Sequence, residues 1–224
     1  MCSNNTRREV SLASTRDNRT TAERTGPLMT TALQHANASR ITGNLWIGGD
    51  LETRRPALAR VQLDELDAAG ITDIVDCRIE WNDQDWVTAA KPHLGYLWLG
   101  VDDAGQQMPD RWFEIGTSHI LNRLEVGATV LTHCHMGINR GPSMGFATLL
   151  ALGWDPIDAL DRIRTRRPIA YVAYAEPALD WWLRSQSATR TDRIDAQARI
   201  AQWRSENHLD VADAIRRIRQ RESA

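Results

Sequence analysis

The sequence predicts an α/β domain whose central, mostly parallel sheet is flanked by helices on both faces. Short apolar runs of strand length alternate with longer helical patterns through residues 39–187. Alternation of this kind favours parallel strands joined by helical crossovers. Residues 128–133 centre on Val130 and Leu131, and we interpret them as a hydrophobic strand of a sheet that is covered on both faces. A disordered tail at 1–38 and a helical extension at 188–224 complete the predicted organisation.

The tail is predicted from its composition. It is rich in Thr, Ser, Asn and Arg and poor in large apolar side chains. Such a segment cannot bury enough apolar surface to offset its ordering entropy. It also lacks an apolar stretch that resembles a signal peptide. No window of the chain approaches the roughly 18 apolar residues of a membrane span, so we expect no membrane partner.

The first half of the domain contains two predicted strands and a helix. Residues 44–49 have the composition of a short strand that ends in glycines. Apolar side chains in residues 61–69 recur with helical spacing, and Gly70 ends that pattern. Residues 71–76 are predicted to be a buried strand. We interpret residues 77–94 as a polar, irregular insert.

The second half continues the alternation. Residues 96–99 are predicted to be a strand that runs into an acidic turn, and residues 109–127 a helix opened by a proline. The strand at 128–133 leads through a glycine-containing loop into a helix at 143–152. Further helices are predicted at 155–167, where Asp and Pro begin the helix, and from residue 176. Residues 188–224 have the pattern of two charged helices that pack back on the domain or, alternatively, bind a partner or a second copy.

The bulk composition describes a soluble domain of ordinary size with appendages. The chain has 224 residues, of which 42% are hydrophobic and 25% charged. Its formal net charge of -2 gives no general attraction to nucleic acid, so no nucleic-acid partner is expected. Three cysteines do not make a disulfide framework. We therefore expect a reducing, cytoplasmic compartment.

The residues with the clearest chemistry are those of the loop from His133 to Arg140. A tight loop between a strand end and a helix start turns successive backbone N–H groups inward, which makes an anion-binding nest. These groups and the helix dipole favour the thiolate form of Cys134. Arg140 offers paired N–H donors to a phosphate, and Gly137 allows close approach of the backbone. This one loop therefore supplies a nucleophile, an anion hole and a charge clamp.

The His-Cys-x5-Arg pattern at Cys134 and Arg140 resembles the loop of the cysteine-based protein tyrosine phosphatase superfamily. The chain from 41 to about 187 is similar to the dual-specificity branch, and residues 45–48 look like its opening strand. The resemblance implies a phosphatase-type fold, a phosphocysteine intermediate and metal-independent hydrolysis of phosphate monoesters. We expect no cofactor and no metal ion. The implied substrates are proteins that carry phosphotyrosine or phosphoserine and phosphothreonine.

The resemblance also assigns the remaining site residues. The turn after Tyr96 matches the family's acid loop, so Asp103 is the expected general acid, with Asp102 as the alternative. The family places Ser or Thr directly after the arginine, whereas this chain has Gly141, and Ser143 is the candidate to supply that hydroxyl. The expected substrate-binding residues belong to the loop and the following helix: His135, Met136, Gly137, Ile138, Asn139 and Ser143.

Two further features have a functional and a structural interpretation. Cys77 follows a core strand, and in some superfamily members a cysteine in such a place pairs reversibly with the catalytic one. We favour a buried apolar role for Cys77. The basic cluster at 162–167 is expected to contact helix-end carbonyls and solvent, with recognition of a second phosphate as the alternative.

The sequence leaves four functions open. Protein phosphatase activity fits best. A phosphatase acting on RNA 5′-triphosphate or phosphoinositide is the nearest alternative, but the loop lacks lysines and the chain lacks a long basic groove. A weakly active phosphate-binding module is favoured only by Gly141. A rhodanese-like sulfur transferase is disfavoured because its cysteine loop is typically shorter by a residue.

Overall fold

The structure is a computed structural model that describes residues 33–222. Most of the predicted tail therefore lies outside the described residues. Residues 34–36, which we had assigned to that tail, contact the domain. Their backbone N–H groups donate to the carboxylate of Glu65 at 2.7–3.0 Å, and Ala36 is buried.

A five-stranded sheet forms the centre of the fold, in the order β1-β2-β5-β3-β4. β1 is antiparallel to β2, and all other neighbouring pairs are parallel. The predicted fold class, an α/β domain on a mostly parallel sheet, is confirmed. The strands are β1 (Ala38–Arg40), β2 (Leu45–Gly48), β3 (Asp73–Arg78), β4 (Gly95–Val101) and β5 (Val130–His133).

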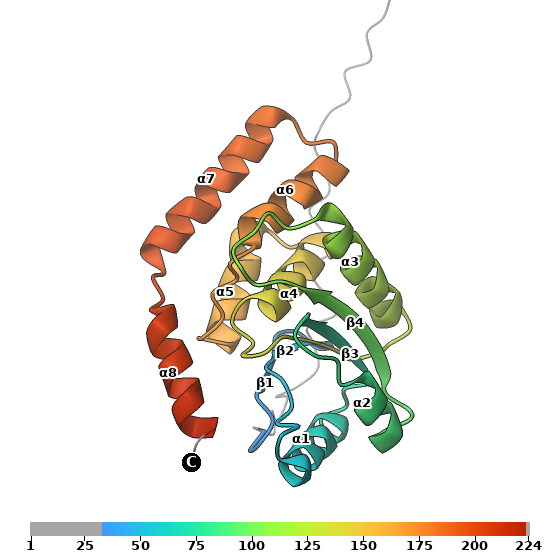
Figure 1. The fold of residues 1–224 in the computed structure, drawn as a ribbon. Coiled ribbons are helices and arrows are strands. Elements are labelled where there is room, and N and C mark those ends of the chain that lie inside the picture. Colours follow the sequence, from blue (N-terminus) through green and yellow to red (C-terminus); the bar gives the residue numbers. More distant parts are fainter. Residues whose placement is uncertain (1–32, 223–224) are drawn as a thin grey trace, which may run out of the picture. The chain divides into compact units, whose positions relative to one another are not determined.

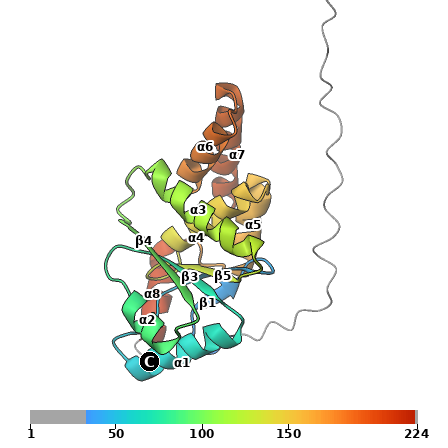
Figure 2. The same ribbon diagram turned by 90° about the vertical axis from the view of Figure 1, so that its right-hand side faces the viewer.

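Helices cover both faces of this sheet. Figure 2 shows α1 and α2 on one side of the strands and α3, α4 and α5 on the other. The helices are α1 (Pro56–Ala68), α2 (Gln84–Ala90), α3 (Asp110–Glu125), α4 (Arg140–Ala151), α5 (Pro156–Arg166), α6 (Ala175–Ser185), α7 (Arg190–Glu206) and α8 (Val211–Glu222). None of the helices in the described part of the chain is long and apolar enough to cross a membrane.

Successive strand residues supply two separate cores. Ile74 of β3 packs with α1 and α2, whereas the next residue, Val75, packs with the larger core under α3, α4 and α6. Val130 and Leu131 of β5 alternate between the cores in the same way. Side chains of a strand point to opposite faces in turn, so a strand buried on both faces needs a continuous apolar run.

Two sequence-based expectations differ from the structure. Residues 77–94 are not an irregular insert, because they contain the end of β3 and the helix α2. Val87 is the buried residue of α2, so the helix shows no apolar periodicity in the sequence. The helix that follows Cys134 begins at Arg140, earlier than predicted. Pro142 does not prevent this, since a first-turn proline lacks only an N–H that the helix does not need.

The C-terminal helices begin as an extension of the larger core. Ile200 and Trp203 of α7 are buried in that core, and the Trp203 indole N–H donates to Asp161 at 2.7 Å. α7 therefore packs back on the domain, as the favoured interpretation of this segment held. In Figure 1, α7 and α8 follow each other along one side of the domain, with α7 beside α5 and α6.

Candidate active site

The candidate site lies where β5 ends, between its two parallel neighbours β2 and β3. Cys134 directly follows β5 and is only 2% exposed. Its backbone N–H donates to the carbonyl of Gly48, at the end of β2, at 3.3 Å. In open parallel sheets this carboxyl edge is the usual place for ligands. The sheet thus fixes the start of the loop that leads to α4.

Arg167 holds the middle of the loop from outside. Its Nε donates to the carbonyl of Gly137 at 2.7 Å, and its Nη2 donates to that of Met136 at 3.0 Å. It also bonds Asn37 Oδ1 and Ser39 Oγ, both in or beside β1. Burial lowers the pKa of Arg167 to about 10, so the guanidinium remains charged at neutral pH. The prediction that this arginine faces helix-end carbonyls and solvent is wrong, because its side chain is buried against the loop.

The two carbonyls that flank those of Met136 and Gly137 also accept hydrogen bonds from residues outside the loop. The carbonyl of His135 accepts from the N–H of Asp50 at 3.0 Å, and that of Ile138 accepts from the N–H of Tyr171 at 2.8 Å. In a trans peptide the N–H points away from the C=O of the same plane. Four successive outward carbonyls therefore require that the following N–H groups point into the loop, as in an anion nest.

Gly137 makes this path possible. Its φ is +67°, in the left-handed region that favours glycine. A Cβ at this position would lie 2.5 Å from the carbonyl oxygen of Gly48. The glycine is therefore required both by the conformation and by the close approach of β2.

Arg140 stands at the first turn of α4, facing the loop. Its Nη1 and Nη2 donate to the two carboxylate oxygens of Glu80 at 2.7 Å each, and Nη1 also donates to the carbonyl of Val101 at 2.9 Å. Burial opposes the charge of Arg140, but the pair with Glu80 outweighs burial and raises its pKa. The same pair lowers the pKa of Glu80. The guanidinium is thus held at one end, while its buried Nε has no hydrogen-bond partner among the described residues.

Asp103 lies beside this edge of Arg140. Its Oδ2 is 3.6 Å from Arg140 Nε, and its Oδ1 accepts a hydrogen bond of 2.9 Å from the Tyr174 hydroxyl. Burial and the bond to Asp103 raise the pKa of Tyr174 to about 12, so the phenol stays a donor. Asp102 is exposed, and its Oδ1 accepts from the N–H of Asp103 at 2.7 Å. Of the two candidate acids, Asp103 is the one that faces Arg140.

The region after the arginine is tightly packed. A Cβ on Gly141 would lie 3.0 Å from the backbone of His133 and 3.2 Å from the N of Cys134. Ser143 is fully buried, and its Oγ accepts from the N–H of Tyr174 at 3.2 Å. This bond ties α4 to the segment that carries the partner of Asp103. Gly141 therefore matches a close helix-to-strand contact.

The other predicted substrate-binding residues line the loop in different ways. Ile138 is buried. His135 Nδ1 lies 2.8 Å from Asp50 Oδ2, and its ring meets Trp81 edge-on at 5.3 Å. Asn139 precedes α4, and its buried Oδ1 has no hydrogen-bond partner among the described residues.

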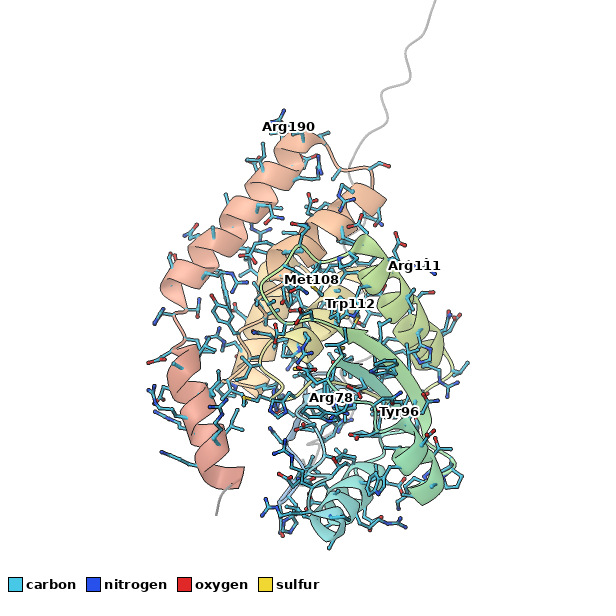
Figure 3. All side chains as sticks on the ribbon, in the orientation of Figure 1. Arg78, Tyr96, Met108, Arg111, Trp112 and Arg190 are labelled. Carbon is cyan, nitrogen blue, oxygen red and sulfur yellow. The ribbon has the colours of Figure 1, made fainter. Side chains whose placement is uncertain are left out.

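A buried network of polar side chains on β3 and β4 lies next to His133, the residue before Cys134. Arg78 makes a forked pair with Asp76 at 2.7–2.8 Å and bonds Asp83 at 2.7 Å. The Tyr96 hydroxyl donates to the same Asp76 at 2.6 Å, and Figure 3 labels both Arg78 and Tyr96 on their neighbouring strands. His133 Nε2 lies 3.6 Å from Asp76 Oδ1, and burial lowers the pKa of His133. The histidine before the cysteine is therefore neutral.

Cys77 lies beside the site on β3. The register pairs Asp76 with His133, so the next residues along the two strands are Cys77 and Cys134. Both are free and buried. Burial raises the pKa of Cys77, which keeps it a thiol.

Comparison with known proteins agrees with this geometry. No family model matches the chain. The tyrosine-protein phosphatase yvh1 of Schizosaccharomyces pombe is 34% identical over 77 residues, which are 34% of this chain and 23% of that protein. The chain thus matches less than a quarter of its curated relative.

Solved structures extend the likeness to about two thirds of the chain. The structure of human DUSP28 superposes with a TM-score of 0.56 at 19% identity, over 67% of this chain and 97% of that one. The structure of PTPMT1 in complex with PI(5)P gives a TM-score of 0.54 at 17% identity, over 67% and 99%. These likenesses show that the chain shares the fold of the dual-specificity phosphatase structures on which it superposes.

Some residues of this candidate site were missed by sequence reasoning. Glu80 lies in the segment interpreted as an irregular insert, and Tyr174 lies far from the loop in sequence. A carboxylate just after a strand that neighbours the catalytic loop was the available signal for Glu80. No local pattern distinguishes Tyr174, because its partner Asp103 is reached only through the fold.

Proposed function

We propose that this protein is a cysteine-dependent, metal-independent phosphatase that hydrolyses phosphate monoesters through a phosphocysteine on Cys134. The proposed clamp is Arg140 and the proposed general acid is Asp103. The reaction needs a reduced thiolate, so a reducing, cytoplasmic setting belongs to the same proposal. Phosphotyrosine and phosphoserine or phosphothreonine proteins are the proposed substrates.

The free edge of Arg140 is the observation that carries this proposal. Glu80 occupies the end of the guanidinium, which leaves Nε–H and the second Nη2–H side by side. A buried donor without a hydrogen-bond partner, such as Arg140 Nε among the described residues, is costly unless a ligand accepts from it. Two parallel N–H groups match two oxygens of a phosphate. The inward N–H groups belong to the same loop, between Cys134 and Arg140.

The proposed first step transfers the phosphoryl group to the enzyme. The Cys134 thiolate forms an S–P bond as the P–O bond to the leaving group breaks. The nest and Arg140 hold the oxygens that carry charge in the transition state. Protonated Asp103 gives its proton to the leaving oxygen, and the Tyr174 hydroxyl holds the carboxyl group in position.

The second step frees the enzyme. Asp103, now a carboxylate, takes a proton from water, and the water oxygen attacks phosphorus as the S–P bond breaks. Phosphate leaves and the thiolate is restored. Gly141 supplies no hydroxyl to assist this departure, and the oxygen of Ser143 is engaged by Tyr174. We therefore expect hydrolysis of the phosphocysteine to be the slow step.

The protein-substrate assignment draws on the curated relative, which is named a tyrosine-protein phosphatase. Phosphoinositide is the second candidate substrate, since PTPMT1 was solved with PI(5)P. Phosphate release from phosphopeptides and from soluble phosphoinositide headgroups, compared at equal concentration, distinguishes these candidates.

Hydrolysis of para-nitrophenyl phosphate in the presence of EDTA tests the chemistry. We expect activity in the wild type, none in Cys134→Ser, and a fall of about 10²-fold or more in Asp103→Asn. The matched control is Asp102→Asn, which changes a neighbouring exposed carboxylate and should retain most of the activity. Retained activity in Cys134→Ser would contradict the proposal.

A further inference from the structure

A pocket of about 660 Å³ opens beside the catalytic loop and is not used by the proposed chemistry. His135 and Met136 of the loop line it, together with Glu80 and Trp81. Glu80 also holds Arg140 at 2.7 Å. The pocket therefore adjoins the phosphate clamp and lies where the rest of a bound substrate would extend.

The C-terminal helix α8 supplies part of the wall of this pocket through Arg219. The helix has a defined start, since Asp210 Oδ1 accepts from the N–H of Asp213 at 2.9 Å. Ala214, one turn further on, is only 5% exposed, so the helix rests on other residues. The preceding helix α7 is fixed in the main core by Trp203. A segment after the phosphatase-type domain thus brings a cation to the mouth of the site.

The carboxylates that line the same pocket are already paired with cations. The pairs are Glu80 with Arg140, Asp83 with Arg78, Asp50 with Arg78, and Glu52 with Arg55, at 2.7, 2.7, 3.6 and 3.8 Å. Paired carboxylates repel an incoming anion much less than free ones do. Local charge therefore does not exclude an anionic group from the pocket.

Arg54 lines the pocket from the loop after β2. It is exposed, and within the part of the chain that the structure describes it has no ion pair. Trp81, Met136 and Leu51 line the same pocket and give it apolar surface. An extended peptide with an acidic side chain complements both kinds of surface that this pocket offers, apolar and cationic.

We propose that Arg54 and Arg219 form a subsite for an acidic side chain next to the phosphorylated residue of a peptide substrate. The inference rests on the proposed phosphatase function and adds the substrate class to it. α8 is then a specificity-determining element contributed by the C-terminal extension.

The test compares phosphopeptides that differ only in the residues beside the phosphorylated one. Phosphotyrosine and phosphothreonine peptides with flanking aspartate or asparagine are assayed on full-length protein. We expect wild type to prefer aspartate by about fivefold or more in kcat/KM, from the modest energy of partly exposed charge pairs. In Arg219→Glu and Arg54→Glu that ratio should fall to about one or below. The matched control is Arg216→Glu, a side chain of the same helix that is 61% exposed and paired with Asp213. It should keep the wild-type ratio.

Several results would overturn the inference. They are an equal rate for aspartate and asparagine peptides in wild type, equal effects of Arg219→Glu and Arg216→Glu, and a preference for soluble phosphoinositide headgroups over acidic peptides. A rise of para-nitrophenyl phosphate hydrolysis in Arg219→Glu would instead make α8 an obstruction. If wild type hydrolyses nothing, the proposed function fails. Fluorescence anisotropy with the same peptides then tests the charge preference separately.

Discussion

Arg167 shows how one side chain can set the shape of the loop between Cys134 and Arg140. It binds two successive loop carbonyls and two side chains beside β1, and no carboxylate among the described residues pairs with it. The forked guanidinium matches carbonyls at two angles, which a lysine ammonium cannot do equally well. Its position in a basic cluster was visible in the sequence, but its burial was not. Neighbouring Arg166 is exposed, so the sequence pattern alone did not separate the two.

Replacing Arg167 with lysine should therefore impair catalysis through the loop. Losing a bond to a buried carbonyl costs about 1–3 kcal/mol, so kcat/KM for para-nitrophenyl phosphate should fall about tenfold or more. Alkylation of Cys134 by iodoacetamide at mildly acidic pH should slow as well, because a buried positive charge near the thiolate is displaced.

The control for this prediction is Arg166→Lys, which should behave as wild type. Circular dichroism establishes that each variant is folded. A normal alkylation rate in Arg167→Lys, with normal kcat/KM, would contradict a positioning role for this residue.

At the scale of elements, strongly patterned segments were predicted well and segments dominated by buried charge were not. The helix α5 starts as expected, with Asp155 accepting from the N–H groups of Ile157 and Asp158. α2 was missed because it buries only Val87, and the preceding stretch is organised by the ion pairs of Arg78. Such pairs join residues by charge, which leaves no periodic apolar signal.

The element α7 should contribute strongly to stability. Trp203 is 5% exposed, and Arg164 stacks on its ring at 5.2 Å. Trp203→Ala should lower the free energy of unfolding by about 3–5 kcal/mol, because it opens a cavity in the main core. Denaturant unfolding measures this change. Ile194→Ala, on the same helix at 57% exposure, should change it by no more than about 0.5 kcal/mol. Similar values for the two variants would show that α7 is not part of the core.

At the scale of the whole molecule, stability should depend on pH through His133. Burial lowers the pKa of His133 in the folded state, whereas its pKa in the unfolded chain is about 6.5. The unfolded state therefore takes up a proton first as pH falls. The free energy of unfolding should decrease below about pH 6.5 and continue to fall until the folded-state pKa is reached.

Denaturant unfolding between about pH 7 and pH 5 checks this slope. His133→Gln should make it shallower. Burial also lowers the pKa of His119, which is less buried than His133, so His119→Gln should reduce the slope less. If the dependence of the free energy of unfolding on pH is unchanged in His133→Gln, another group controls the loss of stability at acidic pH.

The loop that carries Cys134 and Arg140 was predictable because strand, glycine and helix are contiguous in the sequence. Glu80 and Tyr174 were not, because the sheet order and the α4 contact bring them to the loop from distant segments. Local patterns thus predict the nucleophile and clamp. The residues that orient these groups depend on long-range packing.

Trapping the phosphocysteine is the most direct test of the central claim. Wild-type protein would be mixed with para-nitrophenyl phosphate, quenched in acid within the first turnover and digested for mass spectrometry. We predict that the peptide containing Cys134 carries one added phosphoryl group, and that the same peptide of Cys134→Ser carries none. A protein that releases nitrophenol at a normal rate without label on Cys134, or with label on another residue, would contradict the account.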